Sequence, residues 1–431
     1  MTDEATTLDG TPVTAKDRNK ALDITRGFAV LGILLVNIYM AAQYDMIAMF
    51  TVLLNDLSQS DQQVWKWVNI LLIGPSRALF SMMFGAGMVL LLDRLSTRMP
   101  EKQVKGIYFR RLFVLLGIAL IDFVVFLWWG DVLNAYALAG MLLYLFRNRV
   151  TKTLMIWAAV FMIMASLLLV SLTAVKPMYE GVVAAEMAGE TLTAEQQSLL
   201  DNKDLAAMVN PEDARIGQAK QRELYKGDWA TIAPALWMKG VGTFIANFIM
   251  VLWDAMFMML LGIWAYRKGW LTGEASSSTY VKMSVLGLGL GLGFRYYLLN
   301  QMGTPSFESA ASMNIALLQP SRMLIAFGYL GLIQLFAISS WGAWLKGSIG
   351  AVGQMALTNY LMHSIIFMFT LYGFGLGLYD TMSGVEMMQF AGLIFVAQMI
   401  ISPLWLKSFR FGPFEWLWRS MTYGKRQQFK K

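Results

Sequence analysis

The stretch that decides the fold is residues 22–40, LDITRGFAVLGILLVNIYM, where an apolar run begins directly after Asp23, Thr25 and Arg26. Only the amide of Asn37 interrupts this run. Asn37 follows Arg26 by eleven positions, about three helical turns, so a helix places both side chains on one face. At about 1.5 Å per residue the amide lies about 16 Å deeper than the guanidinium, roughly half the hydrocarbon thickness of a bilayer. The stretch therefore predicts a membrane-spanning helix with a polar stripe.

The composition of the whole chain agrees with a membrane protein. Hydrophobic residues make up 57% of the 431 residues, charged residues make up 15%, and the mean hydropathy is +0.51. Soluble domains contain about 25% charged residues. The chain has no cysteine, which excludes disulfides, thiolate metal sites and a cysteine nucleophile, and we expect no metal site. Its one histidine, His363, limits imidazole chemistry to a single position.

Apolar stretches long enough to cross a bilayer recur along the chain. They lie near residues 24–41, 70–92, 110–129, 131–146, 153–175, 241–266, 279–299, 319–341, 353–377 and 387–406. The fourth is short, so eight or nine spans is the alternative to ten. We predict an all-α polytopic membrane protein with about ten transmembrane helices, within a range of eight to ten.

Lysine and arginine indicate the orientation, because they concentrate in the cytoplasmic loops of membrane proteins. They crowd both ends of the chain and the segment 93–111, whereas the opposite loops 300–318 and 378–386 contain none. We therefore expect cytoplasmic N- and C-termini. The net charge of +7 then reflects topology and contact with anionic headgroups of the lipid bilayer, and no nucleic acid is expected as a partner.

The distribution of polar residues divides the chain into five parts. They are a polar cytoplasmic N-terminus at 1–20, membrane helices at 21–175, an extracytoplasmic helical insert at 176–240, further membrane helices at 241–406, and a cytoplasmic interfacial tail at 407–431. The insert contains two helix-start signals, a capping box from Thr193 to Gln196 and an Asn210-Pro211 cap. The opening residues lack the apolar core of a cleaved signal peptide.

Ionisable residues inside the predicted spans are the main candidates for a site, because such groups usually face a bundle interior or a cavity. They are Arg77, Asp122, Asp254 and His363, with Arg295 and Arg322 nearer the outer ends of their spans. Asn359 and His363 stand at i and i+4, which puts an amide and an imidazole on one helix face. Each of these groups has either a structural role, as an ion pair or hydrogen bond, or a functional one.

The segment GLGLGLG at residues 287–293 resembles a phosphate-binding loop only superficially, because no strand precedes it. Two pairs of glycines, Gly287 with Gly291 and Gly289 with Gly293, instead predict close packing against a neighbouring helix.

The tail at residues 409–426, FRFGPFEWLWRSMTYGKR, mixes aromatic and basic residues. It is either an interfacial helix on the cytoplasmic leaflet or a helix that packs under the bundle and shapes a cytoplasmic mouth. In the second case Asp23 and Glu415 are expected to pair with arginines there, and Arg419 becomes a candidate for ligand binding.

Four segments carry a resemblance to a known family. They are LDITRGFAVLGILLVNI at 22–38, ALFSMMFGAG at 78–87, GQMALTNYLMHSIIF at 353–367 with YGFGLGLY at 372–379, and FGPFEWLWRSMTYGK at 411–425. They resemble the YeiB-type family of bacterial inner-membrane proteins, which has no settled function. The resemblance implies a multi-pass protein of the bacterial inner membrane.

That family is more remotely similar to the transmembrane acyltransferases, of the acyltransferase-3 and heparan-glucosaminide acetyltransferase types. Those proteins move an acyl group from cytoplasmic acyl-CoA to an acceptor on the far side. The similarity rests on the first helix, where an Arg-Gly pair is followed by a polar residue eleven positions after the arginine. The acyltransferase-3 type has a catalytic histidine there and this chain has Asn37, while residues 38–76 contain no histidine to replace it.

Three hypotheses about function follow. The first is an acyltransferase-like enzyme with acyl-CoA as donor and an extracytoplasmic or lipid acceptor, in which His363 is the base and Asn37, Asn359 and Arg77 are polar helpers. In it Arg26 binds an anionic headgroup or coenzyme phosphate, and Arg26, Asn37 and Arg77 line one cavity open to the cytoplasm.

The second hypothesis is a transporter or permease, in which Asp254, His363 and the arginines carry protons or an anionic substrate. The third is a non-catalytic membrane protein. A homo-oligomer is compatible with all three.

Overall fold

The computed structural model describes residues 18–44, 53–301 and 316–431, and these residues are almost entirely helical. Its first half contains α1 (Lys20–Ala42), η2 (Leu54–Asp56), α3 (Gln59–Leu71), α4 (Pro75–Ser96), α5 (Glu101–Val124), α6 (Leu133–Leu143), η3 (Tyr144–Phe146), α7 (Thr151–Ser171), η4 (Leu172–Ala174), α8 (Val175–Met187), α9 (Ala194–Asp201), α10 (Lys203–Val209) and α11 (Pro211–Leu224). Its second half contains α12 (Trp229–Ala246), the π-helix η5 (Asn247–Val251), α13 (Leu252–Arg267), α14 (Ser277–Gln301), α17 (Leu318–Ile338), α18 (Ala343–Gln354), α19 (Ala356–Leu371), α20 (Gly384–Ser408) and α21 (Pro413–Tyr423). The described residues form no strand.

Six helical segments are long and apolar enough to cross a membrane. They are Lys20–Ala42, Gln59–Ser96, Thr151–Met187, Trp229–Arg267, Leu318–Ile338 and Gly384–Ser408, with shorter apolar helices at Leu133–Phe146 and Ala356–Leu371. The predicted all-α polytopic membrane class is therefore confirmed. All ten predicted spans coincide with helices, but α5 and α14 are not among the six, because α5 opens on charged residues and α14 is rich in glycine. The count of ten stays a prediction.

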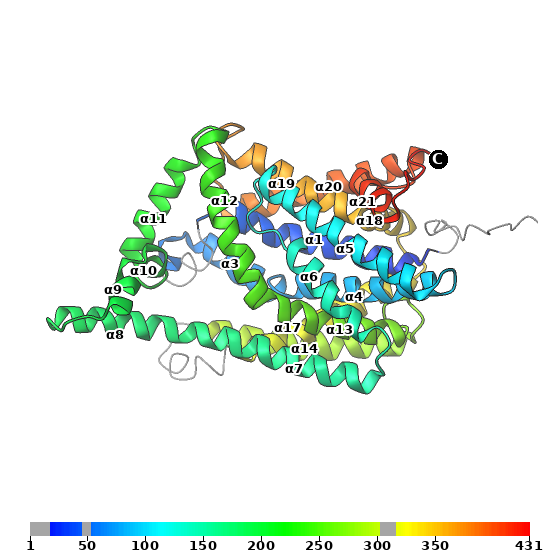
Figure 1. Cartoon of the computed structure of the whole chain (residues 1–431), viewed down its shortest axis with the longest axis horizontal. Helices are drawn as coiled ribbons and strands as arrows, with labels where there is room; N and C mark the ends of the chain where they lie inside the picture. The colour runs from blue at the N-terminus through cyan, green and yellow to red at the C-terminus, as the bar shows by residue number, and fades with distance from the viewer. Residues whose placement is uncertain (1–17, 45–52, 302–315) are drawn as a thin grey trace, which may run out of the picture.

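The long helices run side by side, and the two ends of this bundle differ (Figure 1). Helices α8 to α11 project from one end, which we call the insert end. Helix α21 and the C-terminus lie at the other, the C-terminal end. In the insert the Thr193–Gln196 capping box and the Asn210 cap are both present, as predicted. Which end faces the cytoplasm stays a prediction.

Helix α1 lies inside the bundle and packs tightly against α18 and α4. A Cβ on Gly353 would stand 1.9 Å from the carbonyl oxygen of Asp23, and one on Gly27 would stand 2.2 Å from that of Ile349. The backbones of α1 and α18 are therefore in direct contact, since only glycine fits there. This contact puts the opening stretch of the sequence in the core.

Helices α14 and α17 also touch through their backbones. A Cβ on Gly287 would stand 2.6 Å from the amide nitrogen of Gly328, and one on Gly291 would stand 3.0 Å from that of Ile325. Nothing lies within 4 Å of a Cβ built on Gly289 or Gly293. The close packing predicted for the glycine pairs is confirmed for the first pair and is wrong for the second, which lies on the opposite side of the helix.

Three helices are interrupted within the bundle. Residues 72–74 separate α3 from α4, and Gly74 has φ of +94°, a conformation that favours glycine. The π-helix η5 lies between α12 and α13, and Met355 separates α18 from α19. All three interruptions border the polar clusters described next.

Candidate functional site

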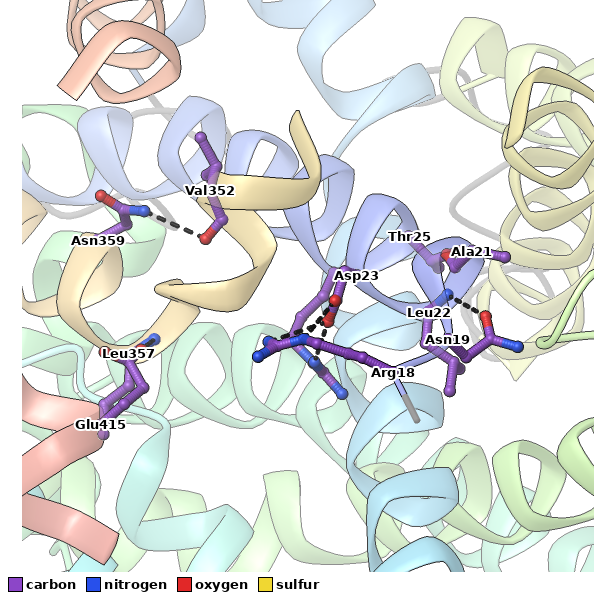
Figure 2. A network of polar contacts seen from close by, with 11 residues as sticks. Arg18, Asn19, Ala21, Leu22, Asp23, Thr25, Val352, Leu357, Asn359 and Glu415 are labelled. Atoms are coloured by element: carbon purple, nitrogen blue, oxygen red, sulfur yellow. Dashed lines mark hydrogen bonds and ion pairs between the residues drawn. The ribbon is translucent and has the colours of Figure 1, made fainter. Parts of the chain in front are cut away.

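The first polar cluster lies at the C-terminal end of the bundle and is built on α1. Asp23 accepts hydrogen bonds from Arg18 Nε at 2.6 Å and from Arg26 Nη1 at 3.1 Å (Figure 2). Asp23 is buried, whereas both arginines are half-buried. The predicted pairing of Asp23 with an arginine is thus present, and it involves Arg26 itself.

Glu415 lies in the same region but has different partners from those expected. Its carboxylate accepts hydrogen bonds from the backbone N–H groups of Leu357 and Thr358, at 2.7 and 3.0 Å, and from the Thr358 hydroxyl at 2.5 Å. The expectation that Glu415 pairs with an arginine is wrong, because it caps the first turn of α19, where free N–H groups attract a carboxylate. Burial raises the pKa of Glu415 above its usual value.

Two further arginines complete this cluster. Arg111 of α5 stacks on the Trp418 ring, with its guanidinium carbon 3.6 Å from the ring centroid, and its carbonyl accepts the Trp418 indole N–H at 2.8 Å. Arg419 lies over the Phe411 ring at 4.7 Å. Burial lowers the pKa of Arg419 to about 10, and the nearby positive charge of Arg18 acts in the same direction. Arg419 remains charged at neutral pH.

We call this group the terminal cluster. It consists of Arg18, Asp23, Arg26, Arg111, Glu415 and Arg419. Since α21 contacts both α5 and α19, the tail packs under the bundle, as one of the two predictions for it proposed. The cluster has four guanidinium groups against two carboxylates, and both carboxylates already have partners.

A second cluster lies inside the bundle. Arg77 of α4 forms an ion pair with Asp254 of α13, at 3.0 Å between Nη2 and Oδ2, and Arg322 of α17 forms an ion pair with the other oxygen of Asp254. The side chains of Asp254 and Arg322 are each 6% exposed and that of Arg77 is 36% exposed. The carboxylate therefore joins three helices.

Arg295 of α14 approaches the same place. Its Nη2 donates to the side-chain oxygen of Asn69 at 3.2 Å, and its Nη1 lies 3.7 Å from a Cβ built on Gly74. The same Cβ would stand 2.3 Å from Cδ of Arg322. Arg295 and Arg322 thus converge on the turn that precedes α4. We call Arg77, Asp254, Arg295 and Arg322 the embedded cluster.

His363 lies on α19 and is 1% exposed. Its ring neighbours are Tyr360 and Phe367, with centroids 6.5 and 6.4 Å away. Neither ring nitrogen has a hydrogen-bond partner among the described residues. Asn359, one turn earlier, donates to the Val352 carbonyl (Figure 2) and to the Ser402 hydroxyl, both at 3.1 Å. Asn359 is therefore engaged in packing α19, whereas the imidazole has unused hydrogen-bonding capacity.

The cavity that Arg26, Asn37 and Arg77 were predicted to share stays a prediction, and the carboxylate partner expected for Arg77 is present. Arg26 lies in the terminal cluster and Arg77 in the embedded cluster, and each already has a carboxylate partner. Asn37 is half-buried on α1, and within the described part of the chain its amide has no hydrogen-bond partner. The spacing within α1 was predicted from helix geometry, but the direction of its polar stripe relative to α4 could not be.

Sequence reasoning missed Asp131, which is 2% exposed in the turn between α5 and α6. It accepts hydrogen bonds from the Tyr360 hydroxyl and the Leu133 N–H, each at 3.0 Å. Asp122, which the sequence did single out, is also fully buried. Asp131 lies between two apolar stretches, so its sequence context is that of an ordinary loop aspartate.

One surface hollow of about 570 Å³ lies between α5 and α21. It is lined mainly by apolar side chains, with Arg110 at its edge, and contains none of the predicted site residues. The described residues bring no three His, Cys, Asp or Glu side chains together in a way that could hold a metal ion.

Comparison with known proteins extends over nearly the whole chain. A family model described as "Protein of unknown function (DUF418)" matches residues 265–425, which include both Arg295 and Glu415. "Uncharacterized protein YxaH" of Bacillus subtilis is 29% identical over 96% of this chain and 96% of its own length. "Uncharacterized protein YeiB" of Escherichia coli is 29% identical over 94% of this chain and 96% of its own length.

Over nearly its whole length the chain is similar to the YeiB-type proteins. The predicted resemblance to that family is confirmed, and its bacterial relatives are consistent with a bacterial multi-pass membrane protein. No solved structure matches it.

Proposed function

We propose that this protein is a membrane-embedded acyltransferase that takes its acyl group from a phosphate-bearing donor such as acyl-CoA. The observation behind the proposal is the terminal cluster, a group of half-buried arginines in which Glu415 contacts the first turn of α19, the helix that also carries the buried His363. Arginine is the side chain best suited to bind phosphate through paired hydrogen bonds. The acceptor is a lipid or an extracytoplasmic molecule.

The charges of the terminal cluster support donor binding. Asp23 is occupied by Arg18 and Arg26, while Glu415 is occupied by the start of α19. Arg111 and Arg419 have no carboxylate partner among the described ion pairs, and both are half-buried. Two guanidinium groups therefore remain for the phosphates of a donor.

The position of His363 supports a catalytic role for the same end of the bundle. Thr358, which contacts Glu415, precedes His363 by five residues on α19, a rise of about 8 Å. A donor held by its phosphates would therefore need only a short flexible arm to bring its thioester toward the imidazole.

The chemistry requires one base and no cofactor. The acceptor oxygen or nitrogen attacks the thioester carbonyl carbon while His363 accepts its proton, the carbon–sulfur bond breaks, and the coenzyme leaves as a thiol after taking that proton. His363 is the only histidine in the chain, so no other imidazole can replace it.

The test is acyl-CoA consumption by purified protein in lipid, over a panel of hydroxyl and amine acceptors. We expect His363→Gln to lower turnover by about 10²–10⁴-fold with little effect on folding, because glutamine fills similar space but does not accept a proton. Arg111→Gln should raise the KM for acyl-CoA. Arg110→Gln is the matched control, since Arg110 is the neighbouring, exposed arginine.

The outcomes separate the parts of the proposal. If turnover is unchanged in His363→Gln, the protein is still an acyltransferase but His363 is not its catalytic base. If Arg110→Gln and Arg111→Gln change the KM for acyl-CoA equally, the terminal cluster is not the binding site of the donor. No thioester consumption by the wild-type protein favours the alternative, a transporter or permease of a small molecule or lipid.

The interrupted helices favour that second candidate. Transporters place their binding sites at discontinuous helices near the bilayer midplane. The turn at Gly74 and the π-helix η5 both adjoin the ion pairs of the embedded cluster. Uptake of an anion into vesicles that contain the protein, without thioester chemistry, would identify this class.

The proposal also assigns the orientation. The C-terminal end faces the cytoplasm of the bacterial inner membrane, in agreement with its excess of lysine and arginine. Because the chain lacks cysteine, a single cysteine introduced near residue 200 can be labelled from either face. Labelling only from the cytoplasmic side would overturn the orientation.

A further inference from the structure

The embedded cluster carries more positive than negative charge. Two guanidinium groups, from Arg77 and Arg322, pair with the single carboxylate of Asp254, and a third, from Arg295, converges with Arg322 on the turn at Gly74. Arg295 and Arg322 are each 5% exposed. A buried charge without a counter-charge is expensive, and inside a membrane it usually marks a functional site.

The cluster lies toward the insert end of the bundle. Helix α5 contacts α21 through its first half, and α4 ends just before α5 begins, so the start of α4 lies toward the opposite end. Helix α17 has the same direction, because Gln334 near its end donates to Thr25 in the first turns of α1, at 3.0 Å. Arg77 and Arg322 therefore stand in the first turns of two helices that both start toward the insert end.

This arrangement adds two helix N-termini to the arginines. The N-terminus of a helix carries a partial positive charge and attracts anions. The fields of α4 and α17 therefore act in the same direction as the three guanidinium groups. Asp254 is the one carboxylate that opposes them among the described contacts of the cluster.

The donors of the cluster are not used up. The Nε groups of Arg77, Arg295 and Arg322 are buried and have no hydrogen-bond partner among the described residues. Buried donors almost always have an acceptor in a folded protein, supplied by protein, water or ligand. The unused N–H groups come from three helices that meet around Asp254 and the turn at Gly74.

We propose that the embedded cluster binds an anionic phosphate group that enters from the insert half of the bundle. One phosphate would bring the local charge near zero and would accept hydrogen bonds from the free Nε groups. The phosphate belongs either to a lipid headgroup or to a soluble molecule. The proposal goes beyond acyl transfer, because binding is measured without any acyl donor.

The experiment uses the full chain purified in a phosphate-free detergent. Binding of inorganic phosphate is measured by calorimetry, and retention of phosphatidylglycerol is measured by native mass spectrometry beside diacylglycerol, a lipid without phosphate. We expect the wild-type protein to bind at least one of the two phosphate compounds and not diacylglycerol. Arg295→Gln should weaken that binding by about tenfold or more, as expected for the loss of a hydrogen bond to a charged group.

Arg222→Gln is the matched control, because Arg222 is an exposed arginine of the insert that pairs with Asp380 at 2.7 Å. It should leave binding unchanged. Arg295→Lys keeps the positive charge and should retain part of the affinity, which guards against misfolding of the glutamine variant. Size-exclusion profiles report folding for every variant.

Each outcome decides the proposal. Binding of inorganic phosphate identifies a soluble ligand, and retention of phosphatidylglycerol alone identifies a lipid headgroup. The proposal is overturned if the wild-type protein binds neither, if it retains diacylglycerol equally, or if Arg222→Gln and Arg295→Gln weaken binding to the same extent.

Discussion

The terminal and embedded clusters use the same residue types in opposite surroundings. In the terminal cluster the arginines are half-buried, stack on aromatic rings and lie at one end of the bundle. In the embedded cluster Arg295 and Arg322 are almost fully buried, and Arg322 shares the single carboxylate of Asp254 with Arg77. The solvent exposure of the arginines therefore distinguishes the two clusters better than their number does.

The difference in solvent exposure gives the arginines of the two clusters different effects on stability. The side chains of Arg18 and Arg26 are 24% and 29% exposed and keep part of their hydration, so their ion pairs contribute less to stability than fully buried pairs do. Buried arginines have lost that hydration and depend on their counter-charge. Removing one carboxylate should therefore have unequal consequences in the two clusters.

The largest expected effect is that of Asp254→Asn. It leaves Arg77 and Arg322 without a counter-charge, and breaking a buried pair costs about 3–5 kcal/mol of unfolding free energy. Thermal and denaturant unfolding in detergent measure the change. Asp56→Asn is the matched control, because Asp56 also pairs with an arginine, Arg215 at 2.8 Å, but on the surface. Equal losses for the two variants would show that burial does not raise the contribution of the Asp254 ion pairs above that of a surface ion pair.

A smaller effect is expected for Glu415→Gln. The glutamine carbonyl can still accept from the N–H groups of Leu357 and Thr358, which share one oxygen, but its NH2 group faces the Thr358 hydroxyl that donated to the other oxygen, which costs about 1–3 kcal/mol. Burial raises the pKa of Glu415 above 4.5, so the folded state binds its proton more tightly than the unfolded state does. The advantage of wild type over the variant should be complete below pH 4.5 and should shrink as the pH rises through the raised pKa. A pH-independent difference between the two proteins would contradict this.

The smallest effect is expected for Arg18→Gln. Asp23 keeps Arg26 as a partner, and both arginines are half-buried, so the change in unfolding free energy should stay below about 1 kcal/mol. Denaturant unfolding at low and high salt measures it. A loss as large as that of Asp254→Asn would show that the terminal cluster is also a buried ion-pair network.

The fold was predictable where the signal is local. Apolar stretches located the helices, and the caps at Thr193 and Asn210 marked two helix starts correctly. The interruption at Gly74 was not predictable, because Gly74-Pro75 inside an apolar region is compatible with both a turn and a kinked helix. Its geometry depends on Arg322, which is distant in sequence.

The site was predictable as a list of residues but not as a set of contacts. Arg77, Asp254 and Arg322 stood out as charges in apolar stretches, yet nothing in their spacing pairs them, because they lie on three different helices. Glu415 was expected to pair with an arginine, but it accepts hydrogen bonds from the free backbone N–H groups at the start of α19 instead. These free N–H groups exist only because a new helix, α19, starts after Met355.

The backbone contact between α14 and α17 has a consequence for the distance between Arg295 and Arg322 in the proposed phosphate site. Gly287 and Gly291 hold the two helices so close that neither can slide or rotate without a clash, and Arg295 and Arg322 each project from one of them. The packing of α14 on α17 therefore fixes the distance between these two guanidinium groups. A Gly287→Ala variant should push α14 away from α17 and widen this gap, which would change the proposed phosphate site without altering any arginine.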